Sequence, residues 1–363
     1  MAHPLSHPET IRERFSAARA LGLRARDAAE HLSLSEGAVL AAHTGVHNYP
    51  LRAVPLKREW LAILKALEAC GPLMALTRND TTVHEKTGVY QHLSAEGPVG
   101  LALGEDIDLR LFFSHWHAGF VVTEAQADGS HAASLQFYDR WGTAVHKVYP
   151  RAQTELMSWE QLLNTWSDHQ QSVTFESGRA PTPARASDGD AQVCAEAFAQ
   201  AWSEMTDTHQ FFGLLRQFGL ERQQAFSLVE GRFAHRVAPD AVRQLLLAAA
   251  LDGTPIMVFV GSPGCIQIHT GPVKRVEPME MRGKTWLNVL DPGFNLHLRE
   301  DRIGHVWIVE KPGDHGTVTS LEVFDDQGEL MAMFFGARKP GKPELSAWRQ
   351  LLQPLRPASA ALA

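Results

Sequence analysis

The chain has 363 residues, of which 44% are hydrophobic, and this is enough for two ordinary domains with separate cores. Its 34 lysines and arginines stand against 41 aspartates and glutamates, and the resulting net charge of -7 disfavours generic nucleic-acid binding, which relies on a basic surface. Cys70, Cys194 and Cys265 are scattered and form no CxxC motif, so the sequence argues against a disulfide framework and against a zinc or iron–sulfur site. We expect all three to be small buried residues.

Targeting and membrane signals are absent from the sequence pattern. The N-terminal residues lack the basic and apolar regions of a secretory signal. No run of about 18 apolar residues occurs in the chain. These features predict a soluble cytoplasmic protein without membrane insertion.

The first half of the chain begins with helices and continues with strands. Apolar spacing predicts helices over residues 11–46 and 59–67, and a closing helix over 155–166. Between them, alternating apolar residues separated by turn residues predict strands over 73–76, 88–92, 99–103, 107–113, 119–123, 133–138 and 143–149.

A stretch rich in Pro, Gly, Ser and Ala, residues 171–191, is the expected linker between residues 1–170 and 192–363. After it the order of elements recurs. We expect helices over 192–250, strands over about 255–336 and a terminal helix over 344–354.

Matching residues recur in the same order in both halves. The pairs are Gly22-Leu23 with Gly219-Leu220, Pro72-Leu73-Met74 with Pro255-Ile256-Met257, Thr87-Gly88 with Thr270-Gly271, Ser134-Leu135 and Asp139 with Ser320-Leu321 and Asp325, and Trp159 with Trp348. Ordered blocks of this kind indicate a tandem duplication. The predicted fold class is α+β, in which each half is a large antiparallel sheet with helices packed against it.

The two copies differ at several charged positions. The second copy has His209, Arg222, Lys311 and Arg338 where the first has Arg12, Ala25, Glu124 and Ala152, and the first has Arg110 where the second has His297. This asymmetry predicts a single site and not two equivalent ones.

His209 is expected in the first turn of an aromatic helix that Thr206 or Asp207 caps and Gly219 ends. The helical period places Phe212 on the same face as this histidine. On the residues alone, the pattern favours a polar first-turn residue without a function at His209.

Arg110 and Phe112 are expected on one face of a strand, because residues 107–113 alternate. They could line a pocket or form a solvated face. Lys311 and Arg338 follow strands and, taken singly, could be surface cations.

Three further histidines have spacings that resemble metal ligands, namely His84, His115 and His117. No third ligand accompanies them. We expect them to be structural or rim residues.

Several segments resemble the bacterial haemin-degrading factor family, of the HemS, ChuS, HmuS and PhuS type. They are Thr206-Asp207-Thr208-His209-Gln210-Phe211-Phe212, Arg222-Gln223-Gln224-Ala225-Phe226, 256–261, Leu76-Thr77-Arg78-Asn79, Leu109-Arg110-Leu111-Phe112, Trp286-Leu287-Asn288, Lys311-Pro312 and 318–322. The resemblance covers nearly the whole chain, including the duplication.

The resemblance implies a cytoplasmic haem-binding protein of a bacterial haem-uptake and iron-acquisition system, with one haem in a cleft between the halves. The family's axial histidine falls on His209. Its distal arginine and pocket phenylalanine fall on Arg110, which the resemblance makes the catalytic candidate, and on Phe112.

The family's haem-propionate partners fall on Arg222, Lys311 and Arg338. The sequence departs from the family at Phe335, where the family often has a tyrosine, so one hydroxyl donor to a propionate is missing. A haem-binding site needs an imidazole for the iron, an apolar slot for the macrocycle and cations for two carboxylates. Phe112, Phe212 and Phe259 are the candidate aromatic rings for the apolar slot.

Two functions follow from the resemblance and use the same pocket. The protein could bind haem and pass it on, as a pure chaperone or storage protein. It could also degrade haem oxidatively as a monooxygenase that uses O2 and an external reductant, since no flavin or nicotinamide motif is visible. A haem-uptake transporter and a haem oxygenase or reductase would then be partners.

Two other classes of function were weighed. Helices on either side of Gly219 resemble a DNA-binding helix-turn-helix, but the negative net charge counts against it. An inert paired-repeat scaffold would leave the asymmetric cations unexplained.

Overall fold

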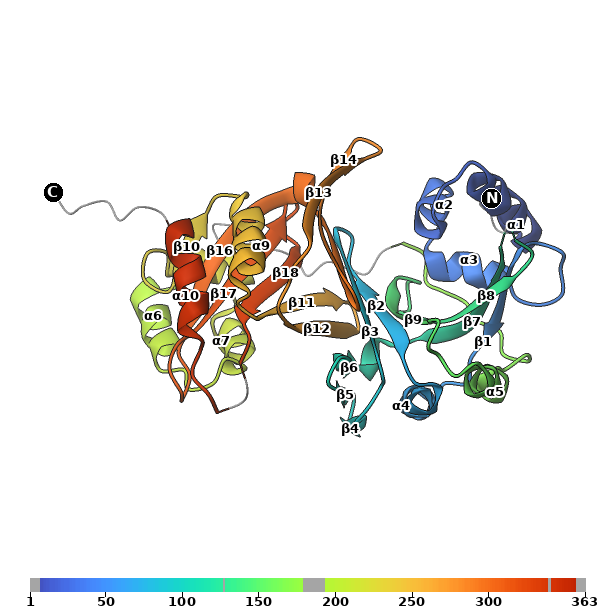
Figure 1. Ribbon diagram of the computed structural model, residues 1–363, viewed down its shortest axis with the longest axis horizontal. Helices are drawn as coiled ribbons and strands as arrows, with labels where there is room; N and C mark the ends of the chain where they lie inside the picture. The colour runs from blue at the N-terminus through green and yellow to red at the C-terminus, as the bar shows by residue number, and fades with distance from the viewer. Residues whose placement is uncertain (1–6, 127, 179–192, 339–340, 357–363) are drawn as a thin grey trace. The chain divides into compact units, whose positions relative to one another are not determined.

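The computed structural model describes residues 7–126, 128–178, 193–338 and 341–356. The chain divides into two compact units. Unit 1 comprises residues 1–78, 84–180 and 261–267, and unit 2 comprises residues 79–83, 181–260 and 268–363. Figure 1 labels the helices and strands of both units.

Unit 1 combines short helices with antiparallel strands. Its helices are α1 (Pro8–Ala20), α2 (Ala25–His31), α3 (Glu36–Ala42), α4 (Trp60–Ala66) and α5 (Leu156–Trp166). Its strands are β1 (Leu51–Pro55), β2 (Leu73–Arg78), β4 (Ser94–Glu96), β5 (Val99–Leu103), β6 (Asp108–Phe112), β7 (Ala118–Ala125), β8 (His131–Tyr138) and β9 (Ala144–Pro150). The strands β3 (Thr82–Gly88), β11 (Ile256–Ser262) and β12 (Cys265–Gly271) have residues in both units.

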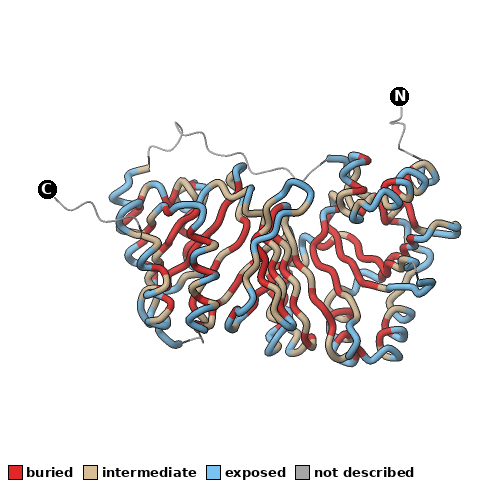
Figure 2. The backbone as a smooth tube through the Cα atoms, turned by 45° about the horizontal axis from the view of Figure 1, so that its top comes forward, coloured by how far each residue is buried: buried red, intermediate tan, exposed pale blue. Residues whose placement is uncertain are grey.

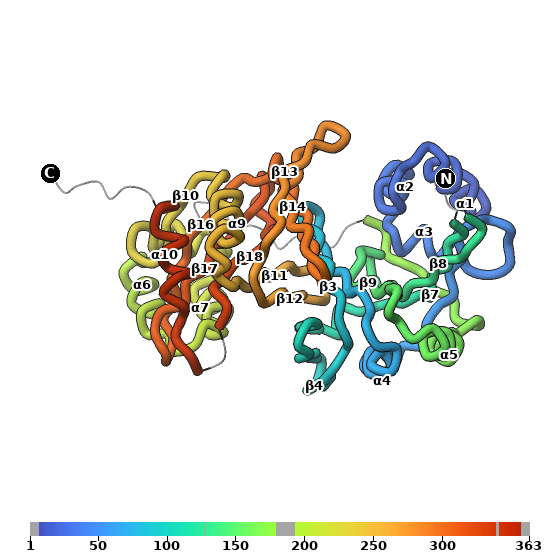
Figure 3. The backbone as a smooth tube through the Cα atoms, in the orientation of Figure 1, coloured from blue at the N-terminus to red at the C-terminus, as the bar shows by residue number. Residues whose placement is uncertain are grey.

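Unit 2 repeats this plan. Its helices are α6 (Ala195–Ser203), α7 (Gln210–Phe218), α8 (Arg222–Leu228), α9 (Ala241–Asp252) and α10 (Ser346–Leu352). Its strands, besides most of β11, are β10 (Ala234–Val237), β13 (Val276–Met281), β14 (Lys284–Asp291), β15 (Phe294–Arg299), β16 (Ile303–Lys311), β17 (Val318–Asp325) and β18 (Leu330–Gly336). Figure 3 shows the β13–β14 hairpin in orange.

The strand order is the same in the two units. Unit 1 has the order β1-β7-β8-β9-β2, and unit 2 has β10-β16-β17-β18-β11, with antiparallel pairing throughout. Unit 1 also contains β4-β5-β6, and unit 2 contains β13-β14-β15. The predicted α+β tandem repeat of antiparallel sheets with packed helices is therefore confirmed.

Helices cover both faces of each sheet because successive strand residues point to opposite sides. In β16, Trp307 and Val309 pack with α6, α7 and α8, whereas Val306 and Ile308 pack with α9 and α10. In unit 1, α1 to α3 cover one face and α4 and α5 the other. Most strands between these helix layers are accordingly buried (Figure 2), whereas β4 and β13 have no buried residue.

The same turn joins the corresponding strands of each copy. After β8, Oδ1 of Asp139 accepts the N–H groups of Trp141 and Thr143 at 2.9 and 2.8 Å. After β17, Oδ1 of Asp325 accepts those of Gln327 and Glu329 at 2.9 and 2.8 Å. Asp139 and Asp325 therefore occupy equivalent positions in the two copies, as the sequence predicted.

Two expected elements were wrong. The strand expected over 88–92 is β3, at Thr82–Gly88. Its buried face carries polar residues, among them His84 and Lys86, so apolar alternation did not mark it. The region 192–250, expected to be helical, contains the short strand β10, which pairs with β16.

Part of the expected linker is described. Val173 is buried, and the ring of Phe175 packs at 6.4 Å from those of Phe120 and Tyr138. Residues 179–191 of that segment lie outside the described residues.

Two further findings bear on the expected class of protein. Cys70 and Cys265 are buried as expected, but Cys194 is exposed. Among the described residues, no helix has the length and apolar character needed to cross a membrane.

Candidate functional site

The turn before α7 holds His209 in an exposed position. Asp207 accepts a hydrogen bond from the backbone N–H of His209 at 2.8 Å. Oε1 of Gln210 accepts the N–H groups of Thr206 and Asp207 at 2.9 and 3.3 Å. The helix begins at Gln210, so His209 immediately precedes the first turn in which it was expected. Its side chain is 91% exposed, which leaves the ring open to a ligand.

The same aspartate fixes the ring of this histidine. Nδ1 of His209 lies 2.7 Å from Oδ1 of Asp207. The backbone N–H of His209 lowers the pKa of Asp207, and the ring of His209 and the charge of Arg338 lower it further. Because an ionised carboxylate only accepts hydrogen bonds, Nδ1 is the donor in this contact, and in the neutral form of the ring Nε2 carries the lone pair. The ring therefore presents the nitrogen that can bind a metal.

Helix α8 starts at Arg222 because of two local features. Gly219 ends α7 with a φ of 65°, a left-handed conformation that glycine adopts without a steric penalty. Glu221 and Gln224 then form a capping box at the start of α8. Together they place Arg222 one short turn after α7.

Aromatic rings surround the cations of this region. The guanidinium carbon of Arg222 lies 5.2, 5.6 and 5.8 Å from the rings of Phe211, Phe212 and Phe226. The ammonium of Lys311 lies 4.7 Å from the ring of Phe211 and 5.9 Å from that of Phe226. Cation–π attraction therefore holds both positive charges against the same rings.

A buried carboxylate lies between these two cations. Glu322, which is fully buried, accepts hydrogen bonds from Nε of Arg222 at 2.6 Å, from Nζ of Lys311 at 2.7 Å and from Oγ of Ser320 at 2.9 Å. Burial alone would raise the pKa of Glu322, but Arg222 and Lys311 outweigh it and lower the pKa to about 2. Burial, aided by the charge of Arg222, lowers the pKa of Lys311 to about 8 against the opposing effect of Glu322.

An open pocket lies next to this cluster. It has a volume of about 450 Å³ and is lined by Phe212, Leu215, Arg216, Gly219, Leu220, Glu221 and Arg222. The side chain of Phe212 is exposed, although it is a large apolar residue. Its apolar lining residues, together with Arg216 and Arg222, suit an apolar ligand that carries carboxylates, although Glu221 also lines the pocket.

Phe259 joins the cluster through the neighbouring strand. In the pairing of β11 with β18 it lies opposite Met333, whose sulfur is 3.3 Å from Nη2 of Arg222. The ring of Phe259 packs edge-on against Phe335, with centroids 4.9 Å apart. Arg338 follows β18 and is close enough for its charge to act on Asp207. Unit 2 thus contains two groups of predicted site residues, Arg222, Lys311 and Phe259 around Glu322 and Met333, and His209 and Arg338 around Asp207.

Arg110 and Phe112 lie in unit 1. Along β6, Leu109 and Leu111 are buried while Asp108, Arg110 and Phe112 are half-buried, which confirms the predicted alternation. Arg110 donates to the carboxylate of Asp108 and, at 3.3 Å, to the carbonyl of Leu109. Their expected contact with a ligand stays a prediction.

Glu322 and Met333 were not predicted as site residues from the sequence. Asp207 was predicted only as a possible helix cap. One signal was present for Glu322. Its counterpart in the first copy is the neutral Gln136, so this position differs in charge between the copies like the predicted site residues.

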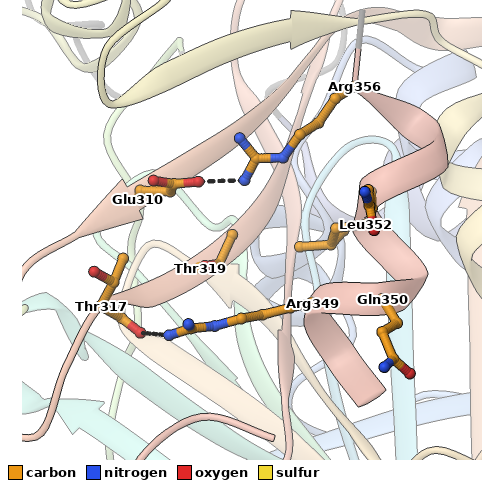
Figure 4. Close-up of a pocket in the computed structure, with 8 residues that line it drawn as sticks. Glu310, Thr317, Thr319, Arg349, Gln350, Leu352 and Arg356 are labelled. Atoms are coloured by element: carbon orange, nitrogen blue, oxygen red, sulfur yellow. Dashed lines mark hydrogen bonds and ion pairs between the residues drawn. The ribbon is translucent and has the colours of Figure 1, made fainter. Parts of the chain in front are cut away.

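A second pocket, of about 300 Å³, contains none of the predicted site residues (Figure 4). Its arginines already have partners. Arg356 pairs with Glu310, and Arg349 donates to Glu344 at 2.9 Å and to the carbonyl of Thr317 at 3.1 Å. We interpret this pocket as part of the attachment of α10 to the sheet.

The other histidines with suggestive spacing have structural contacts. Nδ1 of the buried His84 lies 2.9 Å from Nε2 of Gln267, and Nε2 of His117 lies 2.9 Å from the carbonyl oxygen of Thr174. Within the described parts of the chain, no group of three or more His, Cys, Asp or Glu residues could hold a metal ion.

The chain is similar to known proteins over most of its length. The family model described as the haemin-degrading HemS.ChuX domain matches residues 33–166 and 219–355. The hemin transport protein HemS of Yersinia enterocolitica is 39% identical over 345 residues, which cover 94% of this chain and 96% of that protein.

Solved structures with a similar fold include two relatives. The holo form of PhuS, a heme-binding protein from Pseudomonas aeruginosa, has a TM-score of 0.89 and 42% identity, and the match covers 97% of this chain and 99% of PhuS. ChuS, an E. coli heme oxygenase, has a TM-score of 0.83 and 36% identity, with 96% and 100% covered.

Proposed function

Because the chain belongs to the haemin-degrading HemS/ChuX-domain family, we propose that it is a haem-binding protein of a bacterial haem-uptake system. We place it in the cytoplasm, where it would receive haem that a transporter has imported. A haem oxygenase or a reductase would be the partner that acts when the haem is passed on or degraded.

One observation carries the proposal. An exposed imidazole, His209, is held by Asp207 just before α7, and Phe212 of the same helix lines a pocket together with Arg216 and Arg222. Haem offers matching chemistry, since its iron accepts an imidazole nitrogen, its macrocycle is apolar and its propionates are anionic. The residue types present therefore fit the ligand.

Each side chain has a proposed role. Nε2 of His209 binds the iron, and Asp207 keeps the ring in the required tautomer. Arg222 and Arg338 attract the propionates, and Phe212 and Phe259 contact the macrocycle. The role of Arg110 and Phe112 on the ligand is carried over from the family resemblance.

A haemin titration followed in the Soret region tests the proposal. Wild-type protein should bind one haemin per chain, and His209→Ala should change the spectrum and weaken binding because the iron loses its ligand. His31→Ala is the matched control, since His31 is also exposed but lies in α2. An unchanged spectrum for His209→Ala would show that another residue binds the iron.

Oxidative haem degradation is the second candidate function, and the similarity to ChuS, a heme oxygenase, favours it. The reaction needs O2 and an external electron donor. With a reductant, air and catalase, a degrading protein should lose its Soret band and release iron. A stable band under these conditions would indicate a carrier. Catalase removes free peroxide, which bleaches haem without an enzyme.

A further inference from the structure

The pocket of about 300 Å³ between α10 and the ends of β16 and β17 has a polar floor (Figure 4). Glu310 of β16 lies directly opposite Thr319 of β17, so the two side chains share one face of the sheet. Thr317, two residues before Thr319, points to the same face. Strand alternation therefore places one carboxylate and two hydroxyl groups on the floor of this pocket.

The opposite wall comes from α10 and the turn that follows it. Arg349, Gln353 and Arg356 are spaced by four and three residues, which brings side chains to one side of a helix. Leu352 is the single apolar residue that lines the pocket. Two guanidinium groups therefore face the same small space.

The attachment of α10 uses only part of each guanidinium. Arg349 donates through Nε to Glu344 at 2.9 Å and through Nη2 to the carbonyl of Thr317 at 3.1 Å, whereas Arg356 donates through Nη2 to Glu310. A guanidinium has five N–H groups. In the part of the chain that the structure describes, Nη1 of Arg349 and both Nε and Nη1 of Arg356 have no protein partner. These donors are left for a ligand.

The first copy attaches its last helix without such arginines. Trp159 of α5 corresponds to Trp348 of α10, and both are buried. In the same alignment, Glu160 stands at the position of Arg349 and Ser167 at that of Arg356. The repeat therefore does not need the two arginines to hold this helix on the sheet, and their presence is specific to unit 2.

The charges of the lining residues favour an anion. Glu344, the carboxylate partner of Arg349, has a side chain that is 1% exposed, accepts the N–H of Thr319 at 2.5 Å and does not line the pocket. Glu310 lines the pocket but already accepts from Arg356. Two arginines and one paired glutamate leave one positive charge among the lining residues.

We propose that this pocket binds a small molecule through an oxyanion group, a phosphate or a carboxylate, held between Arg349 and Arg356. The planar guanidinium presents paired N–H groups that match two oxygens of such a group. A volume of about 300 Å³ lies at the lower end of the range for small-molecule sites, so an organic part fits beside Leu352. The site shares no residue with the proposed haem site and does not depend on it.

Isothermal titration calorimetry of the full chain without haemin tests the proposal. Inorganic phosphate and citrate are the two probes, and sodium chloride at matched ionic strength is the control for screening. We expect saturable binding, and the probe with the lower Kd shows which oxyanion the pocket prefers. If neither probe binds, the proposal is wrong.

Arginine variants locate the binding. Arg349→Gln and Arg356→Gln should each raise the Kd of the preferred probe about tenfold, because each removes charge-assisted hydrogen bonds. Arg232→Gln is the matched control and should keep the wild-type Kd, since Arg232 is also an exposed arginine of unit 2 with one glutamate partner, Glu196. If Arg349→Gln or Arg356→Gln binds the probe as tightly as wild type, the two arginines do not hold the group together and the proposal is overturned.

Thr317→Val tests the pocket even if an arginine variant does not fold. Arg349 bonds to the backbone carbonyl of Thr317, so this substitution removes the hydroxyl and keeps the attachment of α10. We expect the Kd of the probe to rise about two- to tenfold, as for the loss of one neutral hydrogen bond. An unchanged Kd would contradict the proposal. Haemin binding should be the same in all these variants, and thermal melts show which of them fold.

Discussion

The buried carboxylate of Glu322 should make the protein sensitive to acid. Its pKa is lowered from the ordinary value of 4.5 to about 2, and its side chain is fully buried. A lowered pKa means that the unfolded chain binds the proton more readily than the folded protein. The stabilisation is therefore present above the unfolded pKa and is lost as pH falls towards the folded pKa.

The size of the effect follows from these two values. The difference between 4.5 and about 2 corresponds to about 3 kcal/mol of folding free energy at neutral pH. About 1 kcal/mol of this should be lost between pH 6.5 and pH 3.5. Glu322→Gln has no proton to gain at this position, so its stability lacks this contribution to the pH dependence.

Urea unfolding of wild type and Glu322→Gln at several pH values measures the effect. The stability difference between the two proteins should shrink by about 1 kcal/mol as the pH falls from 6 to 3.5. Other carboxylates titrate in both proteins, so their contributions cancel in the difference. A difference that does not vary with pH would refute the assignment of a strongly lowered pKa to Glu322.

Two further predictions concern packing and the iron ligand. Gly336→Ala should lower the free energy of unfolding by about 1–3 kcal/mol, because the added Cβ would lie 2.6 Å from Trp348. In α7, an added Cβ at Gly213 would have no atom within 4 Å, so Gly213→Ala should raise the free energy of unfolding by up to about 1 kcal/mol. Chemical unfolding measures both changes. If both substitutions have the same effect, the close approach at Gly336 is not a constraint. Asp207→Ala should speed haem dissociation from the protein about tenfold by freeing the ring of His209, as second-shell changes at metal sites commonly do. A dissociation rate equal to that of wild type would show that the turn alone orients the ring.

The fold was largely predictable because its signals are local or repeated. Apolar alternation predicted most strands. Because the chain is duplicated, elements predicted in one half could be compared with those predicted in the other. The strand β3 was missed because its buried face carries His84 and Lys86, whose polar groups are satisfied by other parts of the fold. Strand β10 is short and lies beside only one strand, β16, so its sequence lacks a long apolar pattern.

The candidate site was predictable in its residue types but not in its connections. Comparison of the copies indicated His209, Arg222 and Lys311. It could not show that Glu322 joins two of them, because strand register and the position of α8 decide that contact. Likewise, the bond from the ring of His209 to Asp207 depends on a turn conformation that no residue pattern specifies.

The packing of α10 has a consequence for synthesis of the chain. Trp348 is fully buried against Gly336 and donates its indole N–H to the carbonyl of Thr319 at 3.0 Å. Until the ribosome has released α10, the sheet face that this tryptophan covers stays open to water. A large aromatic surface of this kind is a binding target for chaperones on nascent chains. Unit 2 therefore completes its core only after α10 has been synthesised, when the turn that holds His209 has already emerged.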